Sequence, residues 1–544
     1  MSDGGLNELP GGWSWIALGQ VLEGIEAGKS FKCDERPPQD GEVGVVKVSA
    51  VTWGEFDESE AKTCTDPDRI EPRFFIQPGD FLFSRANTIN LVGTCVIVRS
   101  VSGRLMLSDK ILRLRFSGIE PKWILYALRT EQGRREIERL ATGNQESMRN
   151  IGQDRIRQIR VPLAPLEEQK RIVSEIEKQL TDLEAGVAAL KRVQANLKRY
   201  RASVLKAACE GRLVPTEAEL ARAEGRDYEP ADKLLERICK ERRAKWEAGQ
   251  LAKMKAVGKT PKDDKWKLSY EDPTQVDASV LPSLPVGWSW ATVHQLASAE
   301  PNSVTDGPFG SNLKTAHYTE EGPRVVRLQN IGDGAFVDVK AHISLEHFET
   351  LGKHRVHLGD VVIAALGEVL PRACLVPESL GPAIVKADCI RVKPDDGLCL
   401  SKYLVVALNA EPTRRRTAKI IHGVGRPRMN LGEIKAISVP LPPLSEQTRI
   451  SAEVDRCFSL AEEVEKLVDA GLARADRLRQ SILKHAFEGK LVPQDPNNEP
   501  ASVLLDRICQ GRAVPTGKPT RGQMSLDFEK PKKPRISRRR SAST

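Results

Sequence analysis

The chain has 544 residues, of which 40% are hydrophobic and 29% are charged, and its formal net charge is +9. This balance is typical of globular proteins, and about 150 residues per domain predicts three or four domains. Since no apolar run reaches about 20 residues and no secretory signal stands at the N-terminus, we expect no membrane span and a cytoplasmic location.

The first 165 residues are predicted to form a globular domain. A β-branched run from Gly44 to Val51, GVVKVSAV, is followed by a Gly-Asp turn at Gly79 and Asp80 and by a helical segment that begins at Trp123. Such alternation is typical of a small α/β or α+β domain.

A long helix is expected next. The segment VPLAPLEEQKRI begins at Val161, and its prolines forbid a helix but tolerate the start of one. Apolar residues then recur at the spacing of a coiled coil, at Ile172, Ile176, Leu183, Leu190, Val193, Leu197, Tyr200 and Val204. The helix should run from Leu166 to about Cys209, roughly 66 Å at 1.5 Å per residue. We predict a helical spacer region at 166–243 and a polar linker at 244–283.

The second half of the chain repeats the first. LPGGWSW at Leu9 returns as LPVGWSW at Leu284, and VPLAPLEEQKRI at Val161 returns as VPLPPLSEQTRI at Val439. EGRLVP at Glu210 returns as EGKLVP at Glu488. Ordered matches of this kind identify two tandem copies of one unit, about 9–243 and 284–512.

The repeat predicts a second globular domain at 284–443 and a C-terminal helical spacer region at 444–512. Its coiled-coil positions are Ile450, Val454, Cys457, Ala461, Val464, Val468, Gly471, Ala475, Leu478 and Ile482. Residues 513–544 are basic and poor in apolar residues, so we expect a disordered tail.

Two coiled-coil helices in one chain can bury each other, and an antiparallel pair would carry the two globules to opposite ends. The helix starts and the LPxGWSW segments match between the copies, whereas the globule interiors scarcely match. This pattern favours a recognition protein over an enzyme, because duplicated catalysis would need the same catalytic residues twice.

These motifs resemble the DNA-specificity subunit of type I restriction-modification systems. The resemblance covers about residues 9 to 512 and is carried by LPxGWxW, the Gly-Asp turns, VPLxPLxEQxRI and EGxLVP, each given twice. It implies two target recognition domains of α+β or α/β fold, separated by two long antiparallel coiled-coil helices with pseudo-two-fold symmetry. The linker and the tail are longer and more basic than the core pattern demands.

The resemblance also implies a function. Each domain would bind one half of a bipartite, asymmetric site on double-stranded DNA, and the helices would act as a spacer between them. The partners implied are two methyltransferase subunits and restriction/translocase subunits, which would use S-adenosylmethionine, ATP and Mg²⁺. The specificity subunit itself would be non-catalytic and would hold no cofactor and no metal.

Candidate DNA contacts are polar and basic residues of loops, because Arg, Asn and Gln match base edges and Lys and Arg match phosphates. In the first domain the candidates are Lys29, Lys32, Arg85, Asn87, Asn90, Gln145 and Arg149. In the second domain they are Ser311, Asn312, Lys314, Arg327, Gln329, Arg372, Arg426 and Arg428. Surface residues of these types are common, so the alternative is that they only close loops.

Other motifs favour a structural role. Trp13, Trp15, Trp288 and Trp290 are interpreted as packing anchors, and Asn150 and Asn430, which the copies share, as turns or helix caps. Arg414, Arg415 and Arg416 are interpreted as a solvated helix face.

Catalytic alternatives find little support. GIEAGKS, from Gly24 to Ser30, has three residues between its glycines where a P-loop has four. The sequence lacks the adenine-methyltransferase tetrapeptide, a helicase P-loop and an HExxH motif, and its ten cysteines stand singly without zinc-ligand spacing. We interpret these cysteines as reduced thiols. The remaining alternatives are an orphan DNA-binding scaffold or regulator with other partners and, less well supported, an enzyme in its own right.

Overall fold

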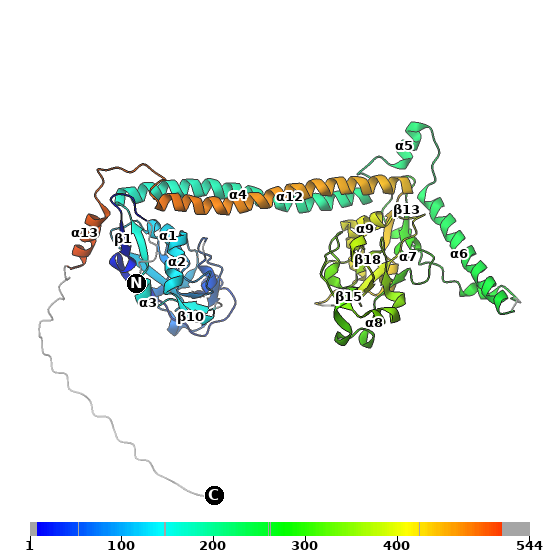
Figure 1. The fold of residues 1–544 in the computed structure, drawn as a ribbon, viewed down its shortest axis with the longest axis horizontal. Helices are drawn as coiled ribbons and strands as arrows, with labels where there is room; N and C mark the ends of the chain where they lie inside the picture. Colours follow the sequence, from blue (N-terminus) through cyan, green and yellow to red (C-terminus); the bar gives the residue numbers. More distant parts are fainter. Residues whose placement is uncertain are drawn as a thin grey trace, which may run out of the picture. The chain divides into compact units, whose positions relative to one another are not determined.

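Figure 1 shows the computed structural model, which describes residues 8–52, 54–145, 148–258, 261, 263–423 and 425–513. The described chain folds into two units. Unit 1 is drawn from residues 1–186 and 474–544, and unit 2 from residues 187–473. The segment predicted to be a disordered tail lies outside the described residues, apart from Ala513.

Unit 1 combines small sheets with short helices. Its strands are β1 (Ser14–Ala17), β2 (Leu22–Ala27), β3 (Val43–Val46), β4 (Ala61–Thr63), β5 (Phe81–Ser84), β6 (Ala86–Asn87), β7 (Cys95–Ile97), β8 (Arg104–Met106), β9 (Ile111–Phe116), β10 (Thr142–Gln145), β11 (Met148–Asn150) and β12 (Arg160–Leu163). Its short helices are α1 (Pro121–Arg129), α2 (Glu131–Leu140), α3 (Gln153–Ile156) and α13 (Ala501–Ala513). The sheets have the orders β2-β9-β5-β7, β4-β3-β8, β10-β11-β6 and β1-β12.

Strand β5 lies at the centre of this globule and is buried along its whole length. Because side chains alternate along a strand, Phe81 and Phe83 join the apolar cluster that contains Trp123 of α1, whereas Leu82 joins a second cluster with Val96. The run FLFS therefore reads as a strand covered on both faces, which explains why it lacks polar alternation.

Unit 2 repeats this plan. Its strands are β13 (Ser289–Thr292), β14 (Val304–Thr305), β15 (Tyr318–Val326), β16 (His342–Ile343), β17 (Arg355–Val356), β18 (Val361–Ala364), β19 (Arg372–Leu375), β20 (Ala383–Val385), β21 (Cys389–Val392) and β22 (Ser438–Leu441). Besides the long helices, its helices are α5 (Glu217–Glu224), α6 (Ala231–Ala256), α7 (Val293–Leu296), α8 (Leu345–Thr350), α9 (Ser401–Asn409), α10 (Glu411–Thr417) and α11 (Leu431–Lys435). The sheet order β14-β21-β18-β19 corresponds to β2-β9-β5-β7, and the pair β13-β22 corresponds to β1-β12.

The Gly-Asp turns carry the same buried contact in both globules. Asp80 pairs with Arg113 of β9 at 2.8 Å, and Asp360 lies 3.8 Å from Arg391 of β21. Each arginine also donates to a main-chain carbonyl in the segment before its turn, at Phe75 and at Arg355 respectively. Since both arginines are at least nine-tenths buried, these bonds offset the cost of taking the charge out of water.

The two long helices are α4 (Leu166–Cys209) and α12 (Leu444–Phe487), and each contributes to both units. In unit 1 Glu184 of α4 meets Arg479 of α12 at 4.0 Å, and in unit 2 Arg201 meets Glu465 at 2.9 Å. Within each unit the two helix segments run side by side in antiparallel directions (Figure 1). The predicted fold class is confirmed, because each copy of the repeat forms an α+β globule that packs on paired long helices.

Burial along the predicted coiled-coil positions is uneven. Ile172, Ile176 and Ile450 are fully buried where a globule covers the helices, whereas Tyr200 and Val464 are 42% and 38% exposed. The physical reason is that a pair of helices shields only a narrow stripe, and the remaining burial at the helix starts comes from the globules.

The repeated twelve-residue helix start forms an equivalent buried polar junction in each unit. In unit 1 Trp13 Nε1 donates to Glu168 Oε1 at 3.2 Å, and in unit 2 Trp288 Nε1 donates to Glu446 Oε1 at 3.0 Å. The two tryptophans are 7% exposed and the two carboxylates 2% or less, which confirms that Trp13 and Trp288 are packing anchors. Burial raises the pKa of Glu168 and of Glu446.

The glutamine that follows each of these glutamates completes the junction. Gln169 donates to Ala164 O at 2.7 Å and accepts from Glu120 N, just before α1. Gln447 donates to Pro442 O at 2.9 Å and accepts from Leu400 N, just before α9. The repeated Glu-Gln pair therefore ties each long helix to the sheet entry and to the first helix of its globule.

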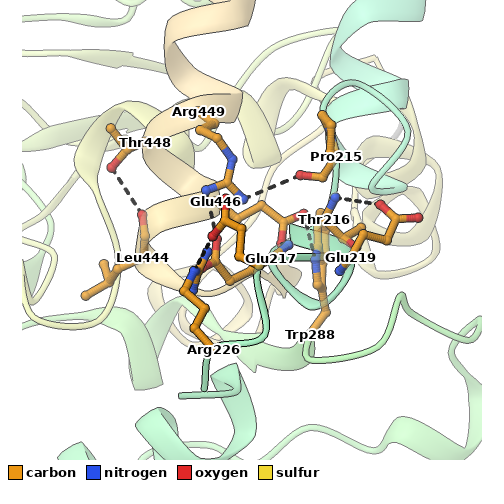
Figure 2. A network of polar contacts seen from close by, with 11 residues as sticks. Pro215, Thr216, Glu217, Glu219, Arg226, Trp288, Leu444, Glu446, Thr448 and Arg449 are labelled. Atoms are coloured by element: carbon orange, nitrogen blue, oxygen red, sulfur yellow. Dashed lines mark hydrogen bonds and ion pairs between the residues drawn. The ribbon is translucent and has the colours of Figure 1, made fainter. Parts of the chain in front are cut away.

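Unit 2 adds helix α5 beside this junction (Figure 2). Glu217 donates its backbone N–H to Glu446 Oε2 at 2.9 Å, and its carboxylate pairs with Arg449 at 2.7 Å and with Arg226 at 2.6 Å. Burial alone raises the pKa of Glu217, but hydrogen bonds from Arg449, Ser445 and Arg226 outweigh it and hold that pKa below its ordinary value. Thr216 caps α5 through its hydroxyl.

Candidate nucleic-acid interface

A small three-stranded sheet gathers candidate residues of unit 1 that lie far apart in the sequence. Strand β11 pairs with β10 on one side and with β6 on the other. The register places Arg149 opposite Asn87, and the N–H of Ile151 donates to the carbonyl of Arg85 at 2.9 Å. Arg85, Asn87 and Arg149 therefore lie at one edge of the globule, as half-buried side chains beside exposed Asn90.

The loop that carries Lys29 and Lys32 reaches the same part of unit 1. Gly28 permits this approach, because a Cβ at that position would lie 1.9 Å from the carbonyl oxygen of Leu107. Ser30 then donates to Asp109, and the next residue, Lys110, accepts through its carbonyl from the N–H of Arg85 at 2.9 Å. Backbone contacts thus connect the Lys29–Lys32 loop to the three-stranded sheet.

The charges of this loop are only partly balanced within unit 1. The Lys29 ammonium pairs with Glu71 at 2.5 Å and holds the pKa of that carboxyl below its usual range. Lys32 is exposed. An exposed ion pair of this kind contributes about 1 kcal/mol or less, so Lys29 can exchange its partner for a phosphate at small cost.

Unit 2 builds the same corner from different residues. Gly307 corresponds to Gly28, because its Cβ would lie 2.1 Å from the carbonyl carbon of Lys386. Arg428 forms isolated bridges with Leu366 and with His422, which repeat the layout of the three-stranded sheet in reduced form. Arg428 also pairs with Asp388 at 2.9 Å.

The loop after Gly307 exposes Ser311, Asn312 and Lys314. It is fastened by two histidines. His347 Nε2 lies 2.8 Å from Asn312 O, and the N–H of Lys314 donates to His317 Nδ1 at 3.2 Å. Partial burial, His347 and Lys314 lower the pKa of His317, so Lys314 supplies the positive charge of this loop near neutral pH.

The remaining candidates of unit 2 lie around Leu328. Arg327 donates to Lys340 O at 3.1 Å, and Arg372 donates to Leu328 O at 3.2 Å, while Gln329 is exposed. Arg372 stands opposite Ala364 in the β18-β19 pair. Ala364 lies two residues before Leu366, which bridges to Arg428. Arg327 and Arg372 are half-buried, and a single main-chain acceptor for each leaves further guanidinium N–H groups for an outside ligand.

Gln145 and Arg426 complete the set of candidates. Gln145 lies in β10 by its backbone, but its side chain is outside the described residues. Arg426 is exposed in the turn between His422 and Arg428.

The residues predicted to have structural roles divide three ways. Asn430 caps α11 and forms a capping box with Glu433, as expected. The interpretation of Asn150 as a turn or cap was wrong, because Asn150 is a strand residue of β11 that stands opposite Ala86. The interpretation of Arg414 and Arg416 as solvated was wrong, because Arg416 stacks over Trp290 at 4.7 Å and Arg414 donates to Pro371 O and pairs with Asp333.

Both corners also contain an aspartate that no sequence motif had indicated. Asp109 and Asp388 stand 279 positions apart, at repeat-equivalent places, and each accepts from a loop residue of its own globule, Ser30 or Arg428. A comparison of the segments before β9 and β21 would have found it. In the residues that the structure describes, no group of three or more His, Cys, Asp or Glu side chains could hold a metal ion.

Two globules with one framework and two different sets of polar loops define a modular recognition protein. Comparison with known proteins agrees. Residues 345–467 match the family described as type I restriction modification DNA specificity domain. The chain is 31% identical over 196 residues to the EcoEI specificity subunit of Escherichia coli, a match that covers 35% of this chain and 33% of that protein.

Other comparisons extend over more of the chain. It is 22% identical over 537 residues to the StySPI specificity subunit of Salmonella potsdam, which covers 94% of this chain and 98% of the relative. A solved chain from a study of complex assembly and conformational transition of the type I R-M system matches its fold, with a TM-score of 0.53, 17% identity and coverage of 89% of this chain and 100% of that one. Residues 345–467 thus match a type I restriction modification DNA specificity domain, and the chain is similar over nearly its whole length to a type I specificity subunit.

Proposed function

We propose that this chain is a non-catalytic DNA-specificity subunit, in which each unit recognises one half of a bipartite, asymmetric DNA sequence. The observation that carries the proposal is the division between what the two units share and what they do not. Their buried junctions and Gly-Asp contacts are equivalent, whereas the loops around Asp109 and Asp388 carry different side chains. Two unlike loop sets on one framework suit two unlike half-sites.

The loop chemistry suits a duplex. Lys29, Lys32 and Lys314 would supply phosphate contacts, while arginines and amides of the same corners would read base edges in the major groove. Arginine is suited to guanine and asparagine to adenine, because each can make two hydrogen bonds to one base. These assignments are proposals for each of the candidate residues named above.

The helix pair offers a surface for partner subunits. Its portion in unit 2 exposes Val193, Tyr200, Leu460, Val464 and Leu467, with Leu467 72% exposed. Apolar side chains exposed on both helices of the pair favour a protein partner. We propose that two methyltransferase subunits dock along the helices and that restriction/translocase subunits join them. S-adenosylmethionine, ATP and Mg²⁺ would belong to those partners.

The proposed role also gives the long helices a purpose. Their length would set the number of unread base pairs between the half-sites, so the spacer would act as a ruler.

In the described residues no helix is long and apolar enough to cross a bilayer. A partner of genomic DNA would reside in the cytoplasm.

Mapping of methylated adenines tests the proposal. The full chain is co-expressed with its methyltransferase partner, and genomic DNA is sequenced for modified adenines. We expect modification within one bipartite sequence only, and co-purification of two methyltransferase copies per chain. Sequence-specific DNA binding without any methyltransferase association would favour the orphan scaffold or regulator, and methyl transfer or cleavage by the isolated chain would indicate an enzyme.

A further inference from the structure

Two cysteines of unit 1 stand opposite each other on neighbouring segments. Asp34 and Thr63 form an antiparallel bridge in which Asp34 N donates to Thr63 O at 3.0 Å and Thr63 N donates to Asp34 O at 2.9 Å. One step along this register, Cys33 faces Cys64. Because bonded and non-bonded pairs alternate in an antiparallel ladder, these cysteines form a non-hydrogen-bonded pair. The N–H of Cys64 donates to Val43 on the other side of β4 instead.

This position suits a covalent link between the two side chains. In a non-hydrogen-bonded pair the Cα atoms lie about 4.5 Å apart, inside the range of about 4.4–6.8 Å that disulfides span. Both side chains point to the same face, since they are directly opposite, and both pack against the apolar cluster of Val43 and Leu105. Burial and then the neighbouring Cys64 raise the pKa of Cys33.

The pair is also accessible. Cys33 and Cys64 are free and half-buried, whereas most other cysteines of the described chain are buried. Cys374 and Cys389 provide a contrast, because they interact electrostatically but are buried on opposite sides of β18, opposite Val362 and Ala364. Strand β18 separates them, so they do not face each other.

We propose that Cys33 and Cys64 are a reversible disulfide site that responds to a disulfide oxidant such as oxidised glutathione. One cysteine thiolate attacks a sulfur of the oxidant, forms a mixed disulfide and releases one glutathione thiolate. The second thiolate attacks the protein-bound sulfur, closes the Cys33–Cys64 bond and releases the other glutathione. The protein loses two protons and two electrons, and one oxidised glutathione becomes two reduced molecules.

The consequence is local. The bond would tie the segment that follows Lys29 and Lys32 to β4, and it would close the chain between residues 33 and 64. In a reducing compartment disulfides are usually transient and redox-sensing, and a thiol reductant would reverse this one. The proposal does not depend on DNA binding, because the bond is detected in the protein alone.

The experiment uses the full folded chain. A Cys509→Ser variant removes an exposed thiol that could link two molecules. The protein is incubated with oxidised glutathione, alkylated, digested and measured by mass spectrometry. We expect one linked pair of peptides that contains Cys33 and Cys64, less two hydrogens, and its disappearance after dithiothreitol. Alkylation of both cysteines after oxidant treatment, or stable glutathione adducts on both without a link, would overturn the proposal.

Single variants supply the controls. Cys33→Ser and Cys64→Ser should each abolish the link while leaving the far-ultraviolet circular dichroism and the melting temperature of the reduced protein nearly unchanged, because serine differs by one atom. Cys374→Ser should leave the link intact. A link that forms only in urea would mean that the folded register does not bring the two thiols together, and the proposal would fail.

Discussion

Arg85 lies where three backbone segments of unit 1 meet. Its N–H donates to Lys110 O, its carbonyl accepts from Ile151, and the next strand, β6, pairs with β11. The backbone is thus fixed on both sides, while the side chain is half-buried at the edge. A side chain held in this way can reach a ligand with little loss of conformational freedom.

Arg85→Glu is expected to weaken DNA binding about tenfold or more, because it would replace the proposed donor to phosphate or guanine by a negative charge that the phosphates repel. Fluorescence anisotropy with a duplex that carries the recognition sequence, repeated at several salt concentrations, measures both affinity and salt dependence. If Arg85 contacts a phosphate, the salt slope falls by about one unit.

Arg99→Glu is the matched control. This variant has the same change of charge as Arg85→Glu. Arg99 lies near the Gly-Asp end of the β5-β7 pair, away from Arg85. Its side chain is 78% exposed and pairs with Glu55. The variant should leave specific affinity almost unchanged. Equal losses in the two variants would mean that only net charge matters.

Glu217 provides a pH-dependent prediction for stability. Because its folded pKa lies below its ordinary value, its contribution is present above the unfolded pKa and is lost as pH falls through the folded pKa. Glu217→Gln should therefore destabilise unit 2 by about 2 kcal/mol near neutral pH, since it replaces the charge-assisted hydrogen bonds of the carboxylate with Arg449 and Arg226 by weaker neutral ones. The difference from the unmodified protein should shrink below about pH 4.

Urea unfolding at several pH values measures this effect. Glu224→Gln, which alters an exposed partner of Arg226, is the control and should cost less than about 1 kcal/mol. A loss from Glu217→Gln that stays constant down to acid pH would show that the carboxylate charge is not its cause.

At the scale of elements, the helix pair has a buried stripe and an exposed apolar one. Ala461 and Val468 are 2% and 3% exposed, while Leu460 and Leu467, one residue before each, are 47% and 72% exposed. Coiled-coil burial therefore explains the first pair of residues and leaves the second pair exposed, as the proposed docking surface requires.

Leu467→Glu should reduce co-purification of the methyltransferase subunit about tenfold, because a charge would enter an apolar interface. Its own folding should be unaffected, since the side chain is already exposed. Leu268→Glu, at an 83% exposed position outside the helix pair, is the control. Undiminished partner binding by Leu467→Glu would place the docking surface elsewhere.

The ruler proposal is tested by helix length. Inserting one heptad in both α4 and α12, near Leu190 and Gly471, keeps the coiled-coil spacing and adds about 10.5 Å of helix. At 3.4 Å per base pair, the unread gap should lengthen by about three base pairs. Methylation mapping reads the new gap.

A heptad inserted at Gly258, after the end of α6, serves as the control and should leave the gap unchanged. Half-sites at their original spacing in the longer variant would mean that the helices do not measure DNA.

At the scale of the whole molecule, unlike loops on a shared framework predict modular specificity. Replacing residues 1–165 by the equivalent segment of another family member should change one half of the methylated sequence and preserve the other. The exchange must keep the buried hydrogen bond between Trp13 and Glu168. The LPxGWSW motif supplies the tryptophan and the VPLxPLxEQ motif supplies the glutamate. Sequencing of modified adenines decides the outcome, and a change in both halves would contradict modular reading.

Much of the framework was predictable because it is written twice. The helix starts at Leu166 and Leu444, the Gly-Asp turns and the packing of Trp13 and Trp288 follow from repeated residues. The repeat did not show which contacts its shared residues make. Glu168 and Glu446 look like ordinary surface residues of a helix start, yet they are buried acceptors for indole N–H groups.

The candidate interface shows the same division. Arg, Asn and Lys could be selected by chemistry, but only the register of β6 with β11 brings Asn87 to Arg149. Arg416 was expected to be solvated because it is charged and lies in a run of arginines, but its guanidinium stacks on Trp290. Surface chemistry is local, whereas burial depends on segments more than a hundred residues away.

The sequence by itself therefore determined the doubling, the order of globule and helix, and the resemblance to specificity subunits, because periodicity and repeated motifs can be seen in the order of residues alone. The tertiary structure alone decided which loops meet, which carboxylates lose their water, and that Cys33 faces Cys64. These depend on strand register, where a slip of one residue reverses every side chain.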